Sequence, residues 1–90
     1  MTESTTKTHF FYILQCKDGS FYAGYTIDRE RRLQEHNEGI GAKYTKPQKR
    51  RPVTMIHTES FATRSEAMKQ EYAFKQLNRK QKESYIANAN

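Results

Sequence analysis

The sequence predicts a single α+β domain in which a three-stranded antiparallel sheet is flanked by helices. Short runs of aromatic and β-branched residues are typical of strands, and helix-capping residues precede the helical segments. Neither repeats nor linkers divide the 90 residues, which suffice for one small core. We expect the order β-β-α-loop-β-α-α, with a disordered N-terminal tail at residues 1–8, a folded domain at 9–87 and a C-terminal tail at 88–90.

The chain is expected to begin with a hairpin. Residues 9–16 and 21–26 are rich in aromatic and β-branched side chains and predict its two strands. Lys17-Asp18-Gly19-Ser20 between them is typical of a turn, because glycine adopts a positive φ without steric cost. Asp28 is a suitable N-cap for a helix that runs to about Asn37 and ends before Gly39.

The second half of the chain predicts a loop, a strand and two helices. Residues 38–52 contain two Gly and two Pro and predict the loop, and residues 53–59 predict a third strand of mixed polarity. Thr63-Arg64-Ser65-Glu66 is a capping box, which begins a helix that we expect to reach about Leu77. Asn78-Arg79-Lys80-Gln81 is a cap of the same type and predicts a last helix through Ile86.

Composition narrows the classes of function. Sixteen Lys and Arg against ten Asp and Glu give a net charge of +6, which favours polyanionic partners, although simple solubility is the alternative. The single Cys16 excludes an intrachain disulfide, and the three His lack the spacing of zinc ligands. No apolar run approaches the roughly 18 residues of a membrane span, and the N-terminus does not resemble a signal peptide. We therefore expect a cytoplasmic protein without a membrane partner.

Whether Tyr12 and Tyr22 share a face of the sheet depends on the hairpin loop. A two-residue turn would place Tyr12 opposite Tyr25 and send Tyr22 to the other face. A three-residue loop with Gly19 in the left-handed conformation would pair Tyr12 with Gly24. Both tyrosines would then share one face, and the glycine would leave space over the phenol. Aromatic side chains in a sheet also commonly belong to the core.

The first predicted helix carries Arg32 and His36 four residues apart, and therefore on one face. A guanidinium can neutralise the charge of a phosphate, and an imidazole can carry or orient a proton. The pair therefore suits phosphate chemistry. An exposed basic helix face is the alternative, since Arg29 and Arg31 lie on the same helix.

Glu71 lies on a mainly apolar arc of the next predicted helix, together with Ala67, Met68 and Phe74. A carboxylate in such a place needs a cationic partner, a proton or a metal. Mg²⁺ is commonly held by one or two carboxylates with water and phosphate, so one Glu can suffice. Pairing with Lys75, four residues further on, or contact with water is the alternative.

The segment of residues 43–51 is basic and contains no acidic residue. It predicts a flexible surface for a phosphate backbone, and its aromatic residue could stack on an exposed base, which is worth about 1–3 kcal/mol. Phosphate contacts carry no base information, so this surface would not select a sequence. A solvated charge run without a partner is the alternative. The candidate nucleic-acid-binding residues are Lys43, Tyr44, Lys46, Lys49, Arg50 and Arg51.

Together these residues resemble the signature of the GIY-YIG nuclease superfamily, particularly its small stand-alone members similar to the catalytic module of structure-specific endonucleases. Tyr22-Ala23-Gly24 matches the second half of the signature, whereas Phe10-Phe11-Tyr12 keeps only the tyrosine of the first half. Arg32 and His36 match the family's helix motif, and Glu71 matches its metal-binding glutamate. The resemblance extends over the whole predicted domain, residues 9–87.

The resemblance implies an endonuclease that hydrolyses phosphodiester bonds in DNA with one divalent metal, Mg²⁺ or Mn²⁺. It would select substrates by structure rather than sequence, in DNA repair or recombination. Glu71 would hold the metal, Arg32 would stabilise the pentacovalent phosphate and His36 would aid proton transfer. Tyr12 would act as general base or orient the attacking water, assisted by Tyr22, if nearby cations lower its pKa from the usual value near 10. Gly24 would be a structural part of the motif.

Two further functions fit the same residues. A nucleic-acid-binding adaptor that retains the nuclease fold without its chemistry would suit the incomplete first half of the signature. A domain that requires a partner protein to supply substrate specificity would suit the short chain. An assay with nucleic acid distinguishes the three functions. The nuclease cleaves, the adaptor binds without cleavage, and the partner-dependent domain gains activity when its partner is added.

Overall fold

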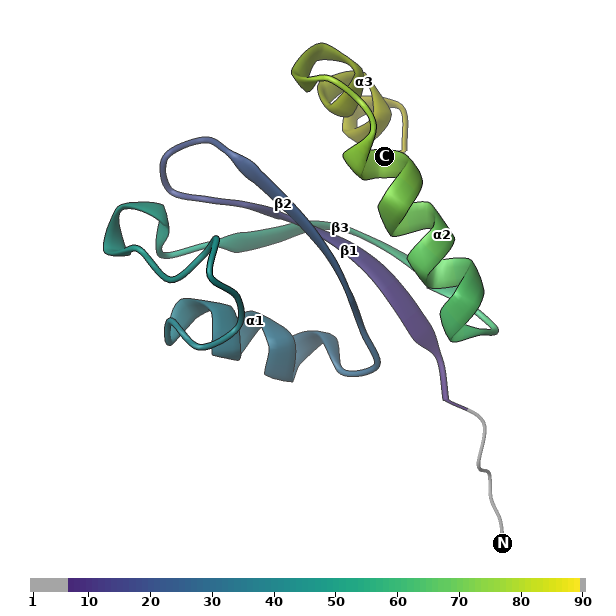
Figure 1. Cartoon of the computed structure of the whole chain (residues 1–90), viewed down its shortest axis with the longest axis horizontal. Coiled ribbons are helices and arrows are strands. Elements are labelled where there is room, and N and C mark those ends of the chain that lie inside the picture. The colour runs from purple at the N-terminus through teal and green to yellow at the C-terminus, as the bar shows by residue number, and fades with distance from the viewer. Residues whose placement is uncertain (1–6, 90) are drawn as a thin grey trace, which may run out of the picture.

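The computed structural model describes residues 7–89 and shows the predicted α+β domain (Figure 1). Residues 1–6, which belong to the expected N-terminal tail, and residue 90 lie outside the described residues. None of the helices within residues 7–89 is long and apolar enough to cross a membrane. The elements are β1 (His9–Gln15), β2 (Phe21–Thr26), α1 (Arg29–Asn37), the short 3₁₀ helix η1 (Gln48–Arg50), β3 (Thr54–Phe61), α2 (Arg64–Lys75) and α3 (Arg79–Ala89).

The sheet is antiparallel with the strand order β2-β1-β3, so β1 is its central strand. Alternation along β1 divides the core into two layers. Phe11 and Ile13 are fully buried on the face that packs against Phe74 of α2. Tyr12 and Leu14 are buried on the other face, where α1 and the loop that follows it lie (Figure 1). The sheet is therefore covered on both faces, and the candidate site belongs to the α1 side.

The hairpin adopts the three-residue loop. Cys16 and Ser20 form the last backbone pair, with a 2.8 Å hydrogen bond from Cys16 N to Ser20 O, and Gly19 has a φ of +87°. In this register Tyr12 faces Gly24, and Leu14 faces Tyr22. Of the two registers that the sequence allowed, the one that places both tyrosines on the same face is confirmed.

The helix ends follow the capping residues. The Asp28 side chain accepts a 3.1 Å hydrogen bond from Arg31 N at the start of α1, and Gly39 has a φ of +84° after its end. Asn78 and Gln81 form a complete capping box, because each side chain accepts from the backbone N–H of the other, at 2.8 and 2.9 Å. Both caps were predicted.

Some predicted boundaries were wrong by a few residues. Helix α2 ends at Lys75 rather than at about Leu77, and α3 extends beyond Ile86 to Ala89, so residues 88 and 89 of the expected C-terminal tail are helical. Strand β3 is longer than predicted at its C-terminal end.

The capping residues of α2 form the predicted contact in one direction. The Thr63 hydroxyl accepts from Glu66 N at 3.2 Å, and it donates to the Glu66 carboxylate at 3.1 Å.

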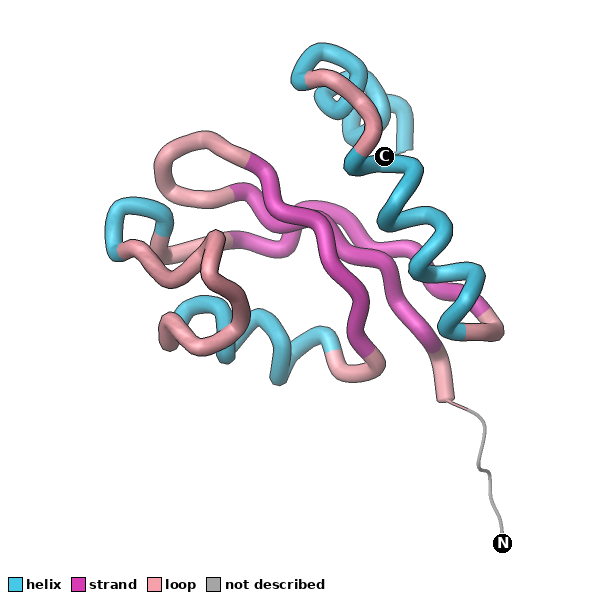
Figure 2. Tube along the Cα trace, viewed as in Figure 1, coloured by secondary structure: helices cyan, strands magenta, loops and turns pink. Residues whose placement is uncertain are grey.

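The loop between α1 and β3 is tied to its neighbours at several points. The Asn37 side chain pairs with the Val53 backbone in both directions, at 2.7 Å to Val53 N and 3.2 Å to Val53 O. Lys17 N donates to Arg50 O at 2.9 Å, which holds the loop beside the hairpin turn (Figure 2). The loop thus forms an ordered wall beside the α1 face of the sheet.

Candidate active site

Tyr12 and His36 form the centre of the candidate site. Strand β1 places Tyr12 on the α1 face, where it is 2% exposed, and α1 directs His36 toward it with an exposure of 0%. The distance from Tyr12 Oη to His36 Nε2 is 2.8 Å. A Cβ at Gly24 would collide with the Tyr12 phenol, so this position on β2 requires glycine. The hairpin and α1 therefore bring together two residues that are 24 positions apart.

The loop completes the surroundings of His36 from the other side. Thr45, itself fully buried, lies with its Oγ1 2.7 Å from His36 Nδ1. Gly41 packs so closely on the imidazole that a Cβ there would lie 2.7 Å from Nδ1. Both ring nitrogens of His36 thus have a buried partner, one on the sheet and one in the loop.

Tyr22 extends this cluster toward solvent. Its ring centroid lies 5.2 Å from that of His36 and 6.5 Å from that of Tyr12. On its other side Tyr44 stacks at 5.8 Å with an interplanar angle of 24°, and the Arg50 guanidinium lies 4.0 Å from the Tyr44 ring centroid. The Tyr44 ring is therefore already in contact with Tyr22 and with Arg50 within the protein, and its use as a base-stacking platform stays a prediction.

Burial sets the protonation of the central pair. Burial, and next the nearby Tyr22, raise the pKa of Tyr12, and the opposing effect of the Arg32 charge is smaller. Arg32 acts in the direction that a basic Tyr12 would need, but desolvation outweighs the guanidinium, so this cation alone does not lower the pKa of Tyr12 below its usual value. Burial and Arg32 lower the pKa of His36 to about 4. At neutral pH the pair consists of a phenol and an uncharged imidazole.

Arg32 lies at the edge of this cluster. Its side chain is 36% exposed and forms an ion pair with Glu35, at 3.2 Å from Nη1 to Oε1. Its charge acts on the pKa of both Tyr12 and His36. Arg32 is therefore close to the buried pair and also accessible, as a group that contacts a phosphate must be.

Glu71 lies on α2, which packs against β2 as well as β1. Its Oε2 accepts a 2.7 Å hydrogen bond from Lys75 Nζ, so the pairing that the sequence left open does form. Lys75 Nζ in turn lies 5.8 Å from the Tyr22 ring centroid, and the Glu71 charge contributes to raising the Tyr12 pKa. The carboxylate therefore lies near the phenols, although α2 mainly covers the other face.

A family model described as the GIY-YIG catalytic domain matches residues 8–84. The chain belongs to this family. A UPF0213 protein from Enterococcus faecalis is 69% identical over 80 residues, which cover 89% of this chain and 91% of the relative. The UPF0213 protein YazA from Bacillus subtilis is 59% identical over 81 residues, which cover 90% of this chain and 80% of the relative.

Two solution NMR structures are similar to this GIY-YIG domain. The protein EF2693 from E. faecalis is 64% identical, with a TM-score of 0.63 over 96% of this chain and 90% of that one. The UPF0213 protein BH0048 from Bacillus halodurans is 46% identical, with a TM-score of 0.58 over 89% of this chain and 83% of that one. The fold of this chain is thus shared with close relatives.

The candidate metal site of this GIY-YIG domain consists of one carboxylate, that of Glu71. Within residues 7–89 no group of three or more His, Cys, Asp and Glu is placed to hold an ion, which argues against a preformed zinc or calcium cage. Glu71 is partly buried, with its side chain 18% exposed. One such carboxylate fits Mg²⁺ or Mn²⁺, which complete their coordination with water and substrate phosphate.

The predicted basic surface separates into two groups. Lys43, Lys46 and Lys49 are exposed. Arg50 forms an ion pair with Asp18 at 3.2 Å and donates to Tyr44 O at 2.9 Å. Arg51 donates to Lys46 O at 2.8 and 3.1 Å. The two arginines hold the loop together, and their use as phosphate contacts stays a prediction.

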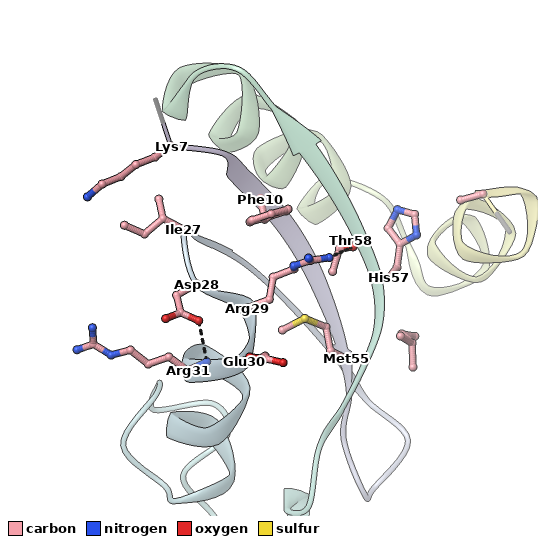
Figure 3. Close-up of a pocket in the computed structure, with 12 residues that line it drawn as sticks. Lys7, Phe10, Ile27, Asp28, Arg29, Glu30, Arg31, Met55, His57 and Thr58 are labelled. Carbon is pink, nitrogen blue, oxygen red and sulfur yellow. Dashed lines mark hydrogen bonds between the residues drawn. The ribbon is translucent and has the colours of Figure 1, made fainter. Parts of the chain in front are cut away.

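Two surface depressions lie near α1. One of about 470 Å³ contains Arg32 and Glu35 and is also lined by Arg64 of α2. The larger depression, of about 1100 Å³, lies between the start of α1 and β3, where Arg29 stacks on Phe10 at 4.3 Å (Figure 3). None of the five predicted catalytic residues lines it, so the smaller depression is the one that adjoins the site.

Sequence reasoning missed several residues of the site. Thr45 and Gly41 enclose His36. Their segment, residues 41–45, resembles the small stand-alone members of the family in sequence, but this resemblance does not predict the contact with His36. Glu35, the partner of Arg32, is an ordinary helix-surface residue by sequence, and Arg64 comes from a distant helix. Only the folded chain brings Thr45 and Gly41 to His36, and Glu35 and Arg64 to the depression that Arg32 lines.

Proposed function

We propose that this GIY-YIG domain is a metal-dependent endonuclease that hydrolyses phosphodiester bonds in DNA. We further propose that it selects its substrates by structure rather than by sequence, in DNA repair or recombination. The observation that carries this proposal is the buried hydrogen bond between Tyr12 and His36, with the accessible guanidinium of Arg32 beside it. Family membership supports the same reaction class.

In the proposed reaction Tyr12 orients the attacking water and passes a proton onward. Its Oη accepts a hydrogen bond from the water while its own proton points to His36 Nε2. As the phenol takes up the water proton, it gives its own proton to the imidazole. This transfer avoids a free phenolate, which burial disfavours. A bound phosphate would raise the low pKa of His36, because an anion stabilises the imidazolium.

Arg32 would stabilise the negative charge that develops on the phosphate. Its partner Glu35 also pairs with Arg31, so Glu35 retains a cation when Arg32 turns to the substrate. Glu71 would hold Mg²⁺ or Mn²⁺, which acts as a Lewis acid on the phosphoryl oxygen when bound. Tyr22, between His36 and Tyr44, would support the phenol of Tyr12 from the solvent side.

The exposed cations explain how affinity could arise without sequence recognition. Lys43, Lys46 and Lys49 project from the ordered loop beside the site. Lysines attract the phosphate backbone of any nucleic acid, and their contacts carry no base information. Selection would then depend on the shape of the substrate, and a partner protein could add to it.

Cleavage of a panel of duplex, nicked, flapped and branched DNA with Mg²⁺ or Mn²⁺ tests the proposal. We expect Glu71→Ala and Arg32→Ala to lower the rate by about 100-fold or more, as for other groups that stabilise charge in a transition state. Glu83→Ala is a matched control, since Glu83 also pairs with a cation four residues away. Arg29→Ala is the control on α1. Equal trace activity in all five proteins would indicate contamination and refute the proposal.

A nucleic-acid-binding adaptor is the second candidate. The ion pair between Glu71 and Lys75 favours it, because the carboxylate is already neutralised without a metal. This function predicts salt-dependent DNA binding that Lys43→Ala, Lys46→Ala and Lys49→Ala each weaken, with no cleavage under any divalent metal. Cleavage that depends on Glu71 would exclude it.

A further inference from the structure

Three hydrogen bonds connect the candidate catalytic tyrosine to the loop. Tyr12 Oη lies 2.8 Å from His36 Nε2, and His36 Nδ1 lies 2.7 Å from Thr45 Oγ1. Thr45 Oγ1 then donates to Ala42 O at 3.3 Å. Tyr12, His36 and Thr45 are at most 2% exposed, so the three side chains are almost wholly buried.

The last bond favours one direction for the others. A backbone carbonyl can only accept, and a threonine hydroxyl has one proton to donate. The Thr45 hydroxyl can direct that proton to Ala42 O at 3.3 Å or to His36 Nδ1 at 2.7 Å. With the proton on Ala42 O, the hydroxyl oxygen accepts from His36, whose Nδ1 then carries the hydrogen. A neutral imidazole has one N–H, so Nε2 has a free lone pair. In this arrangement Tyr12 donates to Nε2.

We propose that Thr45 is a positioning residue that holds His36 in the Nδ1–H tautomer and thereby makes Nε2 the proton acceptor for Tyr12. The effect of this tautomer on catalysis rests on the proposed nuclease function, whereas the assignment of the tautomer does not. In the opposite tautomer Nε2–H would donate to the phenol oxygen. The imidazole could then take no proton from Tyr12, and the transfer proposed above would stop.

The packing of the loop supports this role for Thr45. Gly41 allows the backbone to lie against the imidazole, where any larger residue would meet Nδ1. Thr45 thus approaches the nitrogen from a loop that is fixed on both sides of it, by the Gly41 contact and by the Arg51 bonds to Lys46 O. The position of the loop backbone therefore places the Thr45 hydroxyl at the ring nitrogen of His36.

The tautomer can be measured directly by NMR. In protein labelled with ¹⁵N-histidine, long-range ¹H–¹⁵N correlations at pH 7 distinguish a protonated from an unprotonated ring nitrogen. We expect a protonated Nδ1 at His36 in the wild type and in Thr45→Ser. Thr45→Val keeps the shape of the side chain without the hydroxyl, and we expect a substantial population of the Nε2–H form. His9 and His57 serve as internal references and should not change.

Two results would overturn the proposal. One is an Nε2–H tautomer in the wild type, and the other is an unchanged tautomer in Thr45→Val. A backbone ¹H–¹⁵N spectrum shows whether the valine variant is folded. If it is not, the wild type and Thr45→Ser still decide, because both must show Nδ1–H and a loss of this tautomer in either refutes the assignment.

A kinetic measurement separates this proposal from the proposed function. In an active nuclease we expect Thr45→Val to lower kcat by on the order of 10- to 100-fold, with KM little changed, and Thr45→Ser to restore the rate. A rate in Thr45→Val equal to that of the wild type would refute the positioning role. If no variant or wild-type protein cleaves DNA, the nuclease proposal fails while the NMR result still tests the tautomer.

Discussion

The burial of His36 predicts a specific loss of stability in acid. The pKa of His36 is about 4 in the folded protein against an ordinary value of 6.5. This difference corresponds to about 3 kcal/mol of folding free energy, which is lost when the imidazole of the unfolded chain is protonated and that of the folded chain is not. The unfolded chain binds a proton at this residue below pH 6.5, but the folded chain does so only near pH 4. The free energy of unfolding should therefore fall as the pH is lowered through this window.

Urea unfolding at intervals from pH 7 to pH 4 measures the effect, and His36→Gln isolates it from the titration of carboxylates. The variant cannot gain a proton at position 36, so we expect its stability to fall by about 3 kcal/mol less than that of the wild type over this range. Parallel pH dependences in the two proteins would refute the reasoning. So would an NMR titration that gives His36 an ordinary pKa.

Three further predictions concern other parts of the molecule. Gly24→Ala should lower the free energy of unfolding by about 1–3 kcal/mol, measured in urea, because its Cβ would displace the buried Tyr12 ring. Asn78→Ala should cost about 1 kcal/mol in the same assay through the loss of the α3 cap, and an unchanged midpoint would contradict the cap. Lys75→Met should raise the Mn²⁺ affinity by up to about fivefold, measured by calorimetry, since a partly exposed ion pair with Glu71 is worth about 1 kcal/mol or less. A lower affinity would argue against Glu71 as the ligand.

Local chemistry explains why much of the fold was predictable. The helix ends depend on Asp28, Gly39 and Asn78, whose contacts or backbone conformations involve only neighbours along the chain. Their effects can therefore be deduced from the sequence. The hairpin register needed one more fact, the number of loop residues, and two solutions were open until Gly19 was seen in its left-handed conformation.

The site was less predictable because its chemistry depends on burial. A basic Tyr12 requires nearby cations to lower its pKa, and the Arg32 charge acts in that direction, but the ring is so well enclosed that desolvation dominates. Arg50 and Arg51 looked like free cations in the sequence, whereas the fold gives each of them carbonyl or carboxylate partners. Thr45 became important only because the loop returns to His36, a contact that no local pattern encodes.

The paired hydrogen bonds between Asn37 and Val53 have a consequence for how this domain can diversify. They join the last residue of α1 to the residue before β3, as a strand ladder would. The placement of α1 and β3 therefore does not depend on every residue between them. Insertions near Pro47, beyond the Thr45 contact, could enlarge the exposed lysine surface without moving the Tyr12–His36 pair. Related chains could acquire new binding surfaces by such changes while the hairpin and α1 stay constant.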